Sequence, residues 1–189
     1  TCISVNDTVV HGIPENEPLK KGDLVKVDFG INDRGWITDH CFSKSIGRPQ
    51  PAEQELLTVT RRAIIAGAKL AVVGKKTGDM GAKIQEIVES AGFSVVKEFV
   101  GHGAGHTMHD SPQLPAYGQK GTGVSLKEGM ILCVEAQILG SRNDQVYVED
   151  NGWTVKTVDG AKAAMFEYMV MVGKKEAIFL TDTRDWPLF

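Results

Sequence analysis

Four carboxylates stand in stretches of sequence whose other residues are typical of buried strands. Glu135 lies in the middle of MILCVEAQIL, and Glu167 lies in the middle of AAMFEYMVMV. Asp28 lies in LVKVDFGI, and Asp39 follows it eleven residues later. An ionised carboxylate that is buried without a partner costs several kcal/mol. Each of these side chains therefore needs something that compensates its charge.

Two explanations are open for any one of these carboxylates, namely a pair with Lys or Arg, or the capping of a loop. Around Glu135 and Glu167, however, no Lys or Arg stands within four residues. One or two divalent cations could neutralise all four carboxylates, because clustered carboxylate oxygens bind such ions and can bridge two of them. The pattern favours a metal site.

A nitrogen ligand for such a site could come from the segment GHGAGHTMHD, which holds three of the five histidines, His102, His106 and His109. A solvated loop with hydrogen-bonded histidines is one interpretation. Glycine on both sides of His102 instead indicates close backbone approach or an unusual φ. A binding site is the sharper hypothesis, and no role is assigned to His106.

These residues must be positioned by a fold that mixes strands and helices. Alternating patterns at 24–31 and 36–47 flank turn residues and predict a β-hairpin. Apolar positions at helical spacing predict helices at about 52–73 and 78–91. The region 101–128 is rich in Gly and Pro and is expected to be loop, and strand patterns fill the last third. We therefore expect an α/β or α+β fold with antiparallel pairing.

Length and charge limit the classes of function. A chain of 189 residues suits one domain, here residues 1–189, and can bury about 70% of its unfolded surface. The net charge of −3, without long runs of one sign, gives no footprint for nucleic acid or anionic lipid. Apolar stretches of about ten residues are well short of the roughly 20 that span a bilayer. We expect neither nucleic-acid specificity nor a membrane span.

The cysteines and the first residues bear on the compartment. Cys2, Cys41 and Cys133 are too few and too scattered for a disulfide framework or a zinc knuckle. The opening TCISVN lacks the basic and apolar regions of a signal peptide. Both observations predict a cytoplasmic location.

Several motifs together carry a resemblance to a known family. They are CISVNDTVVHGIP, the pair VDFG and TDH, GHGAGHTMHD, EGMILCVEAQ, NGWTVKT and MFEY. In this order and spacing they resemble type I methionine aminopeptidases, members of the pita-bread metallopeptidases, over nearly the whole chain. The resemblance implies a curved antiparallel sheet covered by helices, and removal of N-terminal methionine from nascent proteins and peptides. The implied partners are the peptide substrate and the ribosome.

The resemblance also implies a dinuclear metal centre made by Asp28, Asp39, His102, Glu135 and Glu167. In the family, the positions of Asp39 and Glu167 bridge both ions. Asp28 would bind one ion, and His102 and Glu135 would bind the other. Two divalent ions are therefore expected, and Co, Mn, Fe and Zn all suit such a ligand set. Glu135 would also handle the proton of the attacking water.

Further roles come from the resemblance alone. His109 would stabilise the oxyanion, and His11 would contact the nitrogen of the following residue as a proton donor. The pocket for the methionine side chain would contain Cys2, Met108, Trp153 and Met165. Each of these four could equally be a plain core residue.

The chain departs from the family pattern at several positions. Type I members commonly carry an aromatic residue at the position of Met108 and Gln at the position of Met165. Ala and Tyr follow Glu135 and Glu167 here, where Pro and His are usual. Members also carry a segment before CISVN, so part of the first half of the fold is expected to be missing. A partner or self-association would then cover the exposed sheet.

Two alternative functions stay open beside methionine removal. A peptidase of the same fold that acts on X-Pro bonds is disfavoured by HGIP and NGWTVKT. A pita-bread module that binds a protein without catalysis usually lacks the metal ligands, which are present in this sequence.

Overall fold

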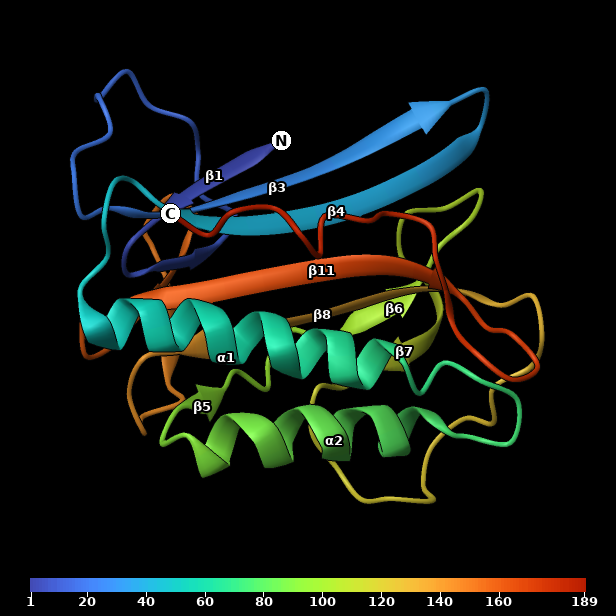
Figure 1. Cartoon of the computed structure of the whole chain (residues 1–189). Helices are drawn as coiled ribbons and strands as arrows, with labels where there is room; N and C mark the ends of the chain where they lie inside the picture. The colour runs from blue at the N-terminus through green and yellow to red at the C-terminus, as the bar shows by residue number, and fades with distance from the viewer.

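Two helices lie along one face of a curved antiparallel sheet (Figure 1). The computed structural model describes residues 1–189. The sheet contains, in spatial order, β1 (Cys2–Val5), β3 (Leu24–Asp33), β4 (Trp36–Ser45), β11 (Ala163–Met171), β8 (Ile131–Leu139), β6 (Gly101–Gly103) and β7 (Asp110–Leu114), with β12 (Ile178–Phe179) beside β11 and β5 (Ser94–Val95) beside β8. A smaller sheet has the order β2 (Thr8–Val10), β10 (Val155–Thr157) and β9 (Val146–Val148).

The helices are α1 (Pro51–Ala68) and α2 (Thr77–Ser90). Pro51 begins α1, where its missing N–H costs nothing, and the carboxylate of Glu53 accepts a hydrogen bond from the backbone N–H of Gln50. The predicted helix at 52–73 ends at Ala68, five residues early. The chain beyond it turns to pair with the segment after β11, where the Val73 N–H donates to the Gly173 carbonyl. The second helix agrees with its prediction within one residue.

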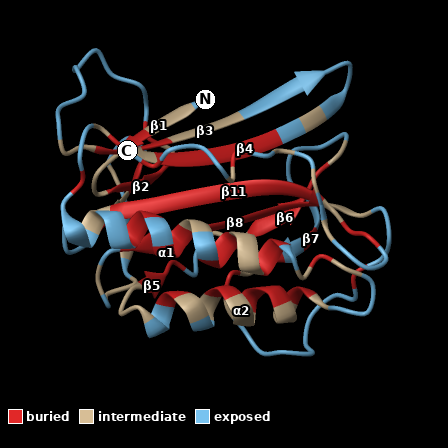
Figure 2. Ribbon diagram, viewed as in Figure 1, coloured by how far each residue is buried: buried red, intermediate tan, exposed pale blue.

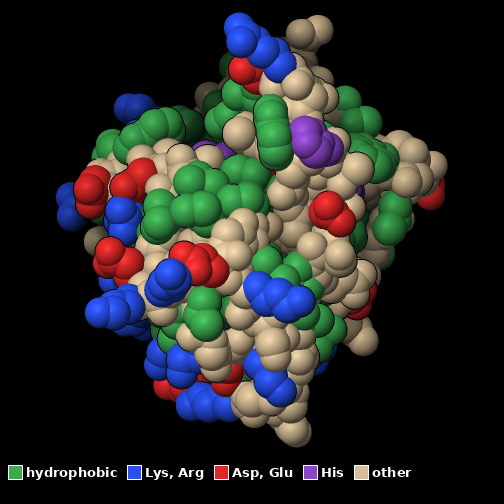
Figure 3. Space-filling view, turned by 90° about the vertical axis from the view of Figure 1, so that its right-hand side faces the viewer, with side chains coloured by type: hydrophobic (Ala, Val, Ile, Leu, Met, Phe, Trp, Pro, Cys, Tyr) green, Lys and Arg blue, Asp and Glu red, His purple; other side chains and the backbone are tan.

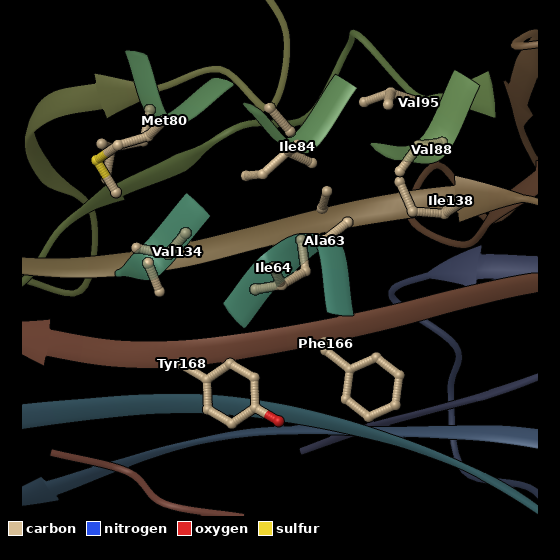
Figure 4. Packing of buried hydrophobic residues seen from close by; sticks show 14 of the residues in the cluster. Ala63, Ile64, Met80, Ile84, Val88, Val95, Val134, Ile138, Phe166 and Tyr168 are labelled. Atoms are coloured by element: carbon tan, nitrogen blue, oxygen red, sulfur yellow. The ribbon is translucent and has the colours of Figure 1, made fainter. Parts of the chain in front are cut away.

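The main core fills the space between the helices and the sheet (Figure 2). Successive side chains of a strand point to opposite faces, so every second residue of β8 and β11 faces the helices. Figure 4 shows side chains of both helices lying against those of β8 and β11, among them Ile64, Ile84, Ile138 and Phe166. Glu135 and Glu167 therefore lie on the opposite face of the same two strands.

The opposite face is covered in part by the smaller sheet. Val9, Val10 and Val155 from that sheet form a second apolar cluster with Leu139 and Met165 of the main sheet. This packing leaves a hollow between the two sheets where β3, β4, β8 and β11 carry their polar residues.

The prediction that 101–128 is loop was wrong for β6 and β7. β6 pairs with β8 and β7 on its two sides. A Cβ on Gly101 would stand only 2.4 Å from the Cys133 carbonyl oxygen, so the absence of a side chain is what allows β6 to pair with β8. A three-residue strand with glycine at both ends has no hydrophobic period by which sequence reasoning could find it.

The C-terminal segment runs along β4 on the helix side of the sheet (Figure 1). The Ser45 N–H donates to the Leu188 carbonyl at 2.8 Å, and Trp186 packs edge-on against Phe42 with ring centroids 5.3 Å apart. Beyond this cover, Ile31 at the far end of β3 is exposed. No helix of the molecule has both the length and the apolar character to cross a bilayer.

Candidate metal centre

The carboxylates of Asp28, Asp39 and Glu167 converge on one point, with ligand oxygens within 4.8 Å of one another. Their positions follow from the strand register. Cys41 of β4 pairs with Asp28 on one side and with Glu167 on the other. Asp39 pairs with Gly30, so Asp28 and Asp39 are diagonal neighbours on one face rather than directly opposite residues.

Glu135 joins this group from the next strand, because it stands directly opposite Glu167 in the β8–β11 register. Glu135 is 9% exposed and Glu167 is 2% exposed. The side-chain amide of Gln137, two residues further along the same face, donates to Glu135 Oε2 at 2.7 Å. Oε1 of Glu167 is buried without any hydrogen-bond partner.

His102 supplies the nitrogen. Its Nδ1 lies 3.0 Å from the Gly103 carbonyl oxygen, which suits an Nδ1–H donor and orients the ring. Its Nε2 then points at the carboxylates, 3.5 Å from Glu135 Oε1 and 3.8 Å from Asp39 Oδ2. A neutral imidazole with a free Nε2 is the form that binds metal ions.

Burial and the neighbouring carboxylates shift the pKa values of these groups. Burial, together with the neighbouring aspartates, raises the pKa of Glu135 to about 8. Burial raises the pKa of Glu167 well above its ordinary value, with Glu135 as the next cause. Burial and Asp39 raise the pKa of Asp28 to about 6. Burial also lowers the pKa of His102, which favours the neutral ring.

A divalent cation fits this arrangement. None of the four carboxylates forms an ion pair with a Lys or Arg. Oε1 of Glu167 has no hydrogen-bond partner in the protein, and Nε2 of His102 points at the carboxylates. Four carboxylates and one imidazole are donors that bind hard and borderline divalent ions.

His109 and His11 lie beside the cluster from different loops. A ring nitrogen of His109 lies within 4.8 Å of Asp39 and His102 donors, and its ring packs edge-on against that of His102 at 4.5 Å. His11 has a positive φ of 60° and stacks on Trp153 with ring centroids 4.3 Å apart. Burial lowers the pKa of His11.

These groups line a cavity of about 320 Å³. Among the residues predicted from the sequence, its wall contains His11, Asp28, Asp39, His102, His109, Glu135, Trp153, Met165 and Glu167. Cys2 and Met108 are outside the lining. Cys2 pairs with Asp28 in the β1–β3 register, and the Met108 methyl covers Gly30, where a Cβ would be 2.2 Å from it. A larger open hollow of about 630 Å³ between α1 and α2 contains none of these groups.

Sequence reasoning missed four residues of the wall, namely Val10, Phe99, Val100 and Gln137. Phe99 packs edge-on against His11 with ring centroids 5.6 Å apart. The period of two along β8 could have found Gln137, which shares a face with Glu135. The strand pattern FSVVKEF contains Phe99 but does not place it in the cavity, because β5 ends at Val95 and Phe99 lies in the connection to β6.

His106 has a structural position outside the cavity. It stacks on Trp36 at 4.0 Å and its Nδ1 lies 2.8 Å from the Gly35 carbonyl oxygen, so it fastens the tip of the β3–β4 hairpin to the segment before β7. Figure 3 views the molecule from this side and shows histidine at the surface beside hydrophobic side chains.

The sequence is similar to known proteins along most of its length. The model of metallopeptidase family M24 matches residues 1–174. A methionine aminopeptidase of Rickettsia prowazekii is 39% identical over 173 residues, which are 92% of this chain and 67% of the relative. Methionine aminopeptidase 1 of Bacillus subtilis is 38% identical over 171 residues, which are 90% of this chain and 68% of the relative.

Solved structures confirm the predicted pita-bread fold. The methionine aminopeptidase of Thermotoga maritima superposes with a TM-score of 0.93 at 40% identity, over 96% of this chain and 73% of its own. An X-Pro aminopeptidase from the same organism, with a TM-score of 0.74 at 20% identity, shares the fold alone. The M24 model spans most of the chain and the methionine aminopeptidases above exceed one third identity, so the chain belongs to metallopeptidase family M24.

Proposed function

We propose that the chain is a metal-dependent aminopeptidase that hydrolyses N-terminal methionine from peptides and nascent proteins. The convergence of four unpaired carboxylates and the His102 Nε2 on one cavity carries the proposal. Relatives at 37–40% identity are methionine aminopeptidases, whereas the X-Pro aminopeptidase is 20% identical over the aligned residues.

The residues that would hold the metal are Asp28, Asp39, His102, Glu135 and Glu167. Membership of family M24 implies divalent metal binding. We propose two ions, because five ligand residues with up to nine donor atoms exceed the needs of one tetrahedral ion. The donor set suits Co, Mn, Fe or Zn. When bound, such ions supply Lewis-acid polarisation of a carbonyl and an acidified water.

The side chains of the cavity would then move protons and hold the substrate. Glu135 would accept the proton of the attacking water, held in orientation by the Gln137 amide. The His109 ring would donate a hydrogen bond to the oxyanion. His11 would donate a proton to the leaving nitrogen, and its stacking on Trp153 fixes its ring for that purpose. Met165 and Trp153, with Phe99, offer apolar contact to a methionine side chain.

The 189 residues would act as one catalytic domain in the cytoplasm, and nascent chains would bring the enzyme to the ribosome. A partner or a second copy would cover the exposed end of β3 around Ile31.

Release of free methionine from a Met-Gly-Ser peptide tests the proposal. The purified chain is chelated and then titrated with Co²⁺ or Mn²⁺, with Glu135→Ala and the exposed Glu128→Ala as a matched pair. We expect metal-dependent release that Glu135→Ala loses and Glu128→Ala keeps. Cleavage of an Ala-Pro peptide alone would assign the chain to the X-Pro peptidases. No cleavage despite bound metal would identify a binding module without catalysis.

A further inference from the structure

Cys133 lies on the same strand face as Glu135 and points toward the metal centre. It is fully buried in β8, where it pairs with His102 of β6. Its Sγ, a ring nitrogen of His102 and an oxygen of Glu167 all lie within 4.8 Å of one another. This sulfur is therefore beside two of the residues proposed above as metal ligands.

A second observation points to a ligand at the same place. Oε1 of Glu167 has no hydrogen-bond partner, although only 2% of this residue is exposed. Zinc holds sulfur at about 2.3 Å and nitrogen or oxygen at about 2.0–2.2 Å. Donors that already lie this close need only small side-chain rotations to share one ion.

The two other cysteines differ from Cys133 in this respect. Cys41 is equally buried, but its Sγ faces the Met165 carbonyl oxygen at 3.9 Å, and it belongs to no group of three metal-binding side chains. Cys2 is half-buried on the edge strand β1 and belongs to no such group either. Among the three cysteines, only Cys133 is both fully buried and grouped with two other metal-binding side chains, those of His102 and Glu167.

We propose that the Cys133 sulfur is a further donor to the metal centre, and that it biases the centre toward zinc, cobalt or ferrous iron and against manganese. On coordination a sulfur–metal bond replaces the S–H bond, and the proton leaves to solvent. Thiolate is a soft ligand that binds zinc well, whereas manganese prefers oxygen donors. The inference rests on the proposed function, because it adds a ligand to the same centre.

X-ray absorption spectroscopy of the zinc-loaded chain tests the inference without an activity measurement. We expect a sulfur scatterer at about 2.3 Å from zinc in the unaltered chain. The scatterer should disappear in Cys133→Ser and persist in the matched control Cys41→Ser. The spectrum of the unaltered chain needs no variant, so a substitution that fails to fold leaves the test intact.

The possible outcomes separate this inference from the proposed function. Zinc bound through nitrogen and oxygen alone in the unaltered chain overturns the Cys133 ligand and leaves the proposed metal centre standing. Zinc that binds equally well after Asp39→Ala and Glu167→Ala overturns the metal centre itself.

Metal competition gives a second readout. Cys133→Ser should lower zinc affinity at least about tenfold, the scale for loss of a metal-site partner, and should change manganese affinity far less. Cys41→Ser should leave both affinities within about twofold of the unaltered chain. An equal loss for both metals in Cys133→Ser would mean that the cysteine acts through packing against Ala104 and Met169 or through its contact with Glu167, and would overturn the inference.

Discussion

Glu135 and Glu167 stand directly opposite each other in adjacent buried strands, with no cation from the protein between them. Like charges at directly paired positions of a sheet repel each other, and burial increases the cost of ionising either one. Ionisation of this pair is therefore unfavourable in the metal-free chain, and a bound divalent cation would offset its free-energy cost.

The stability of the metal-free chain should fall as the pH rises. The pKa of Glu135 is about 8 in the folded chain against an ordinary value of 4.5, so the folded state binds its proton more tightly. Its contribution to stability is present below pH 4.5 and is lost as the pH rises to about 8. Melting temperatures measured in chelator should decline from pH 5 to pH 7, within this window.

Two comparisons isolate the cause of that decline. In Glu135→Gln the decline should be smaller, because one of the three carboxylates with a raised pKa is gone. Saturating Zn²⁺ or Co²⁺ should reverse the decline, since a bound cation favours the ionised carboxylates. A melting temperature of the chelated chain that is constant or rises with pH would contradict the argument.

His11 should matter for turnover and not for metal binding. It lines the cavity and stacks on Trp153, but it belongs to no group of metal-binding side chains. His11→Ala should lower kcat about 10²-fold or more, the scale for loss of a general acid, with unchanged metal content. The control is His106→Ala, which removes an exposed histidine that stacks on Trp36 outside the cavity. Equal losses of kcat in both variants would disprove the role of His11.

Gly101 should be necessary for the position of His102. An added Cβ would meet the Cys133 carbonyl oxygen at 2.4 Å and would force β6 away from β8. Gly101→Ala should therefore cost about 1–3 kcal/mol of unfolding free energy and weaken metal binding. Gly105→Ala, four residues later, is the control because nothing lies within 4 Å of its added Cβ. Urea denaturation and metal titration of both variants decide the matter, and equal behaviour of the two would refute the steric argument.

The site residues that could be predicted from the sequence are those whose charge is unusual among the apolar residues around them. A glutamate within an apolar strand pattern can be read directly from the sequence. Glu135 and Glu167 could therefore be identified as site residues before their spatial neighbours were known. The hairpin of Asp28 and Asp39 was predictable from alternation, although not its diagonal register, which depends on the length of the turn.

The parts that could not be predicted depend on contacts between distant segments. β6 forms because Gly101 allows its backbone to approach the backbone of β8 closely. A strand of three residues has no local sequence pattern that would predict it. Phe99 reaches the cavity only because the chain leads into that strand. Lys26 stands in a strand pattern where a lysine normally faces solvent, and its burial becomes apparent only once β11 and the β1–β2 turn close over it.

Lys26 should make stability depend on pH in the direction opposite to Glu135. Its ammonium donates to the Asn6 and Ala163 carbonyl oxygens, both at 2.9 Å, and burial lowers its pKa from 10.5 to about 7. The unfolded chain therefore binds this proton more tightly between pH 7 and pH 10.5, so stability rises with pH across that window.

Lys26→Met keeps the side-chain volume and removes the titration. Relative to this variant, the unaltered chain should gain unfolding free energy in urea from pH 7 to pH 9.5. Substitution of the half-buried Lys83 on α2, Lys83→Met, should give the same pH profile as the unaltered chain. Parallel pH profiles for the Lys26→Met and unaltered chains would show that the buried ammonium does not titrate in this range.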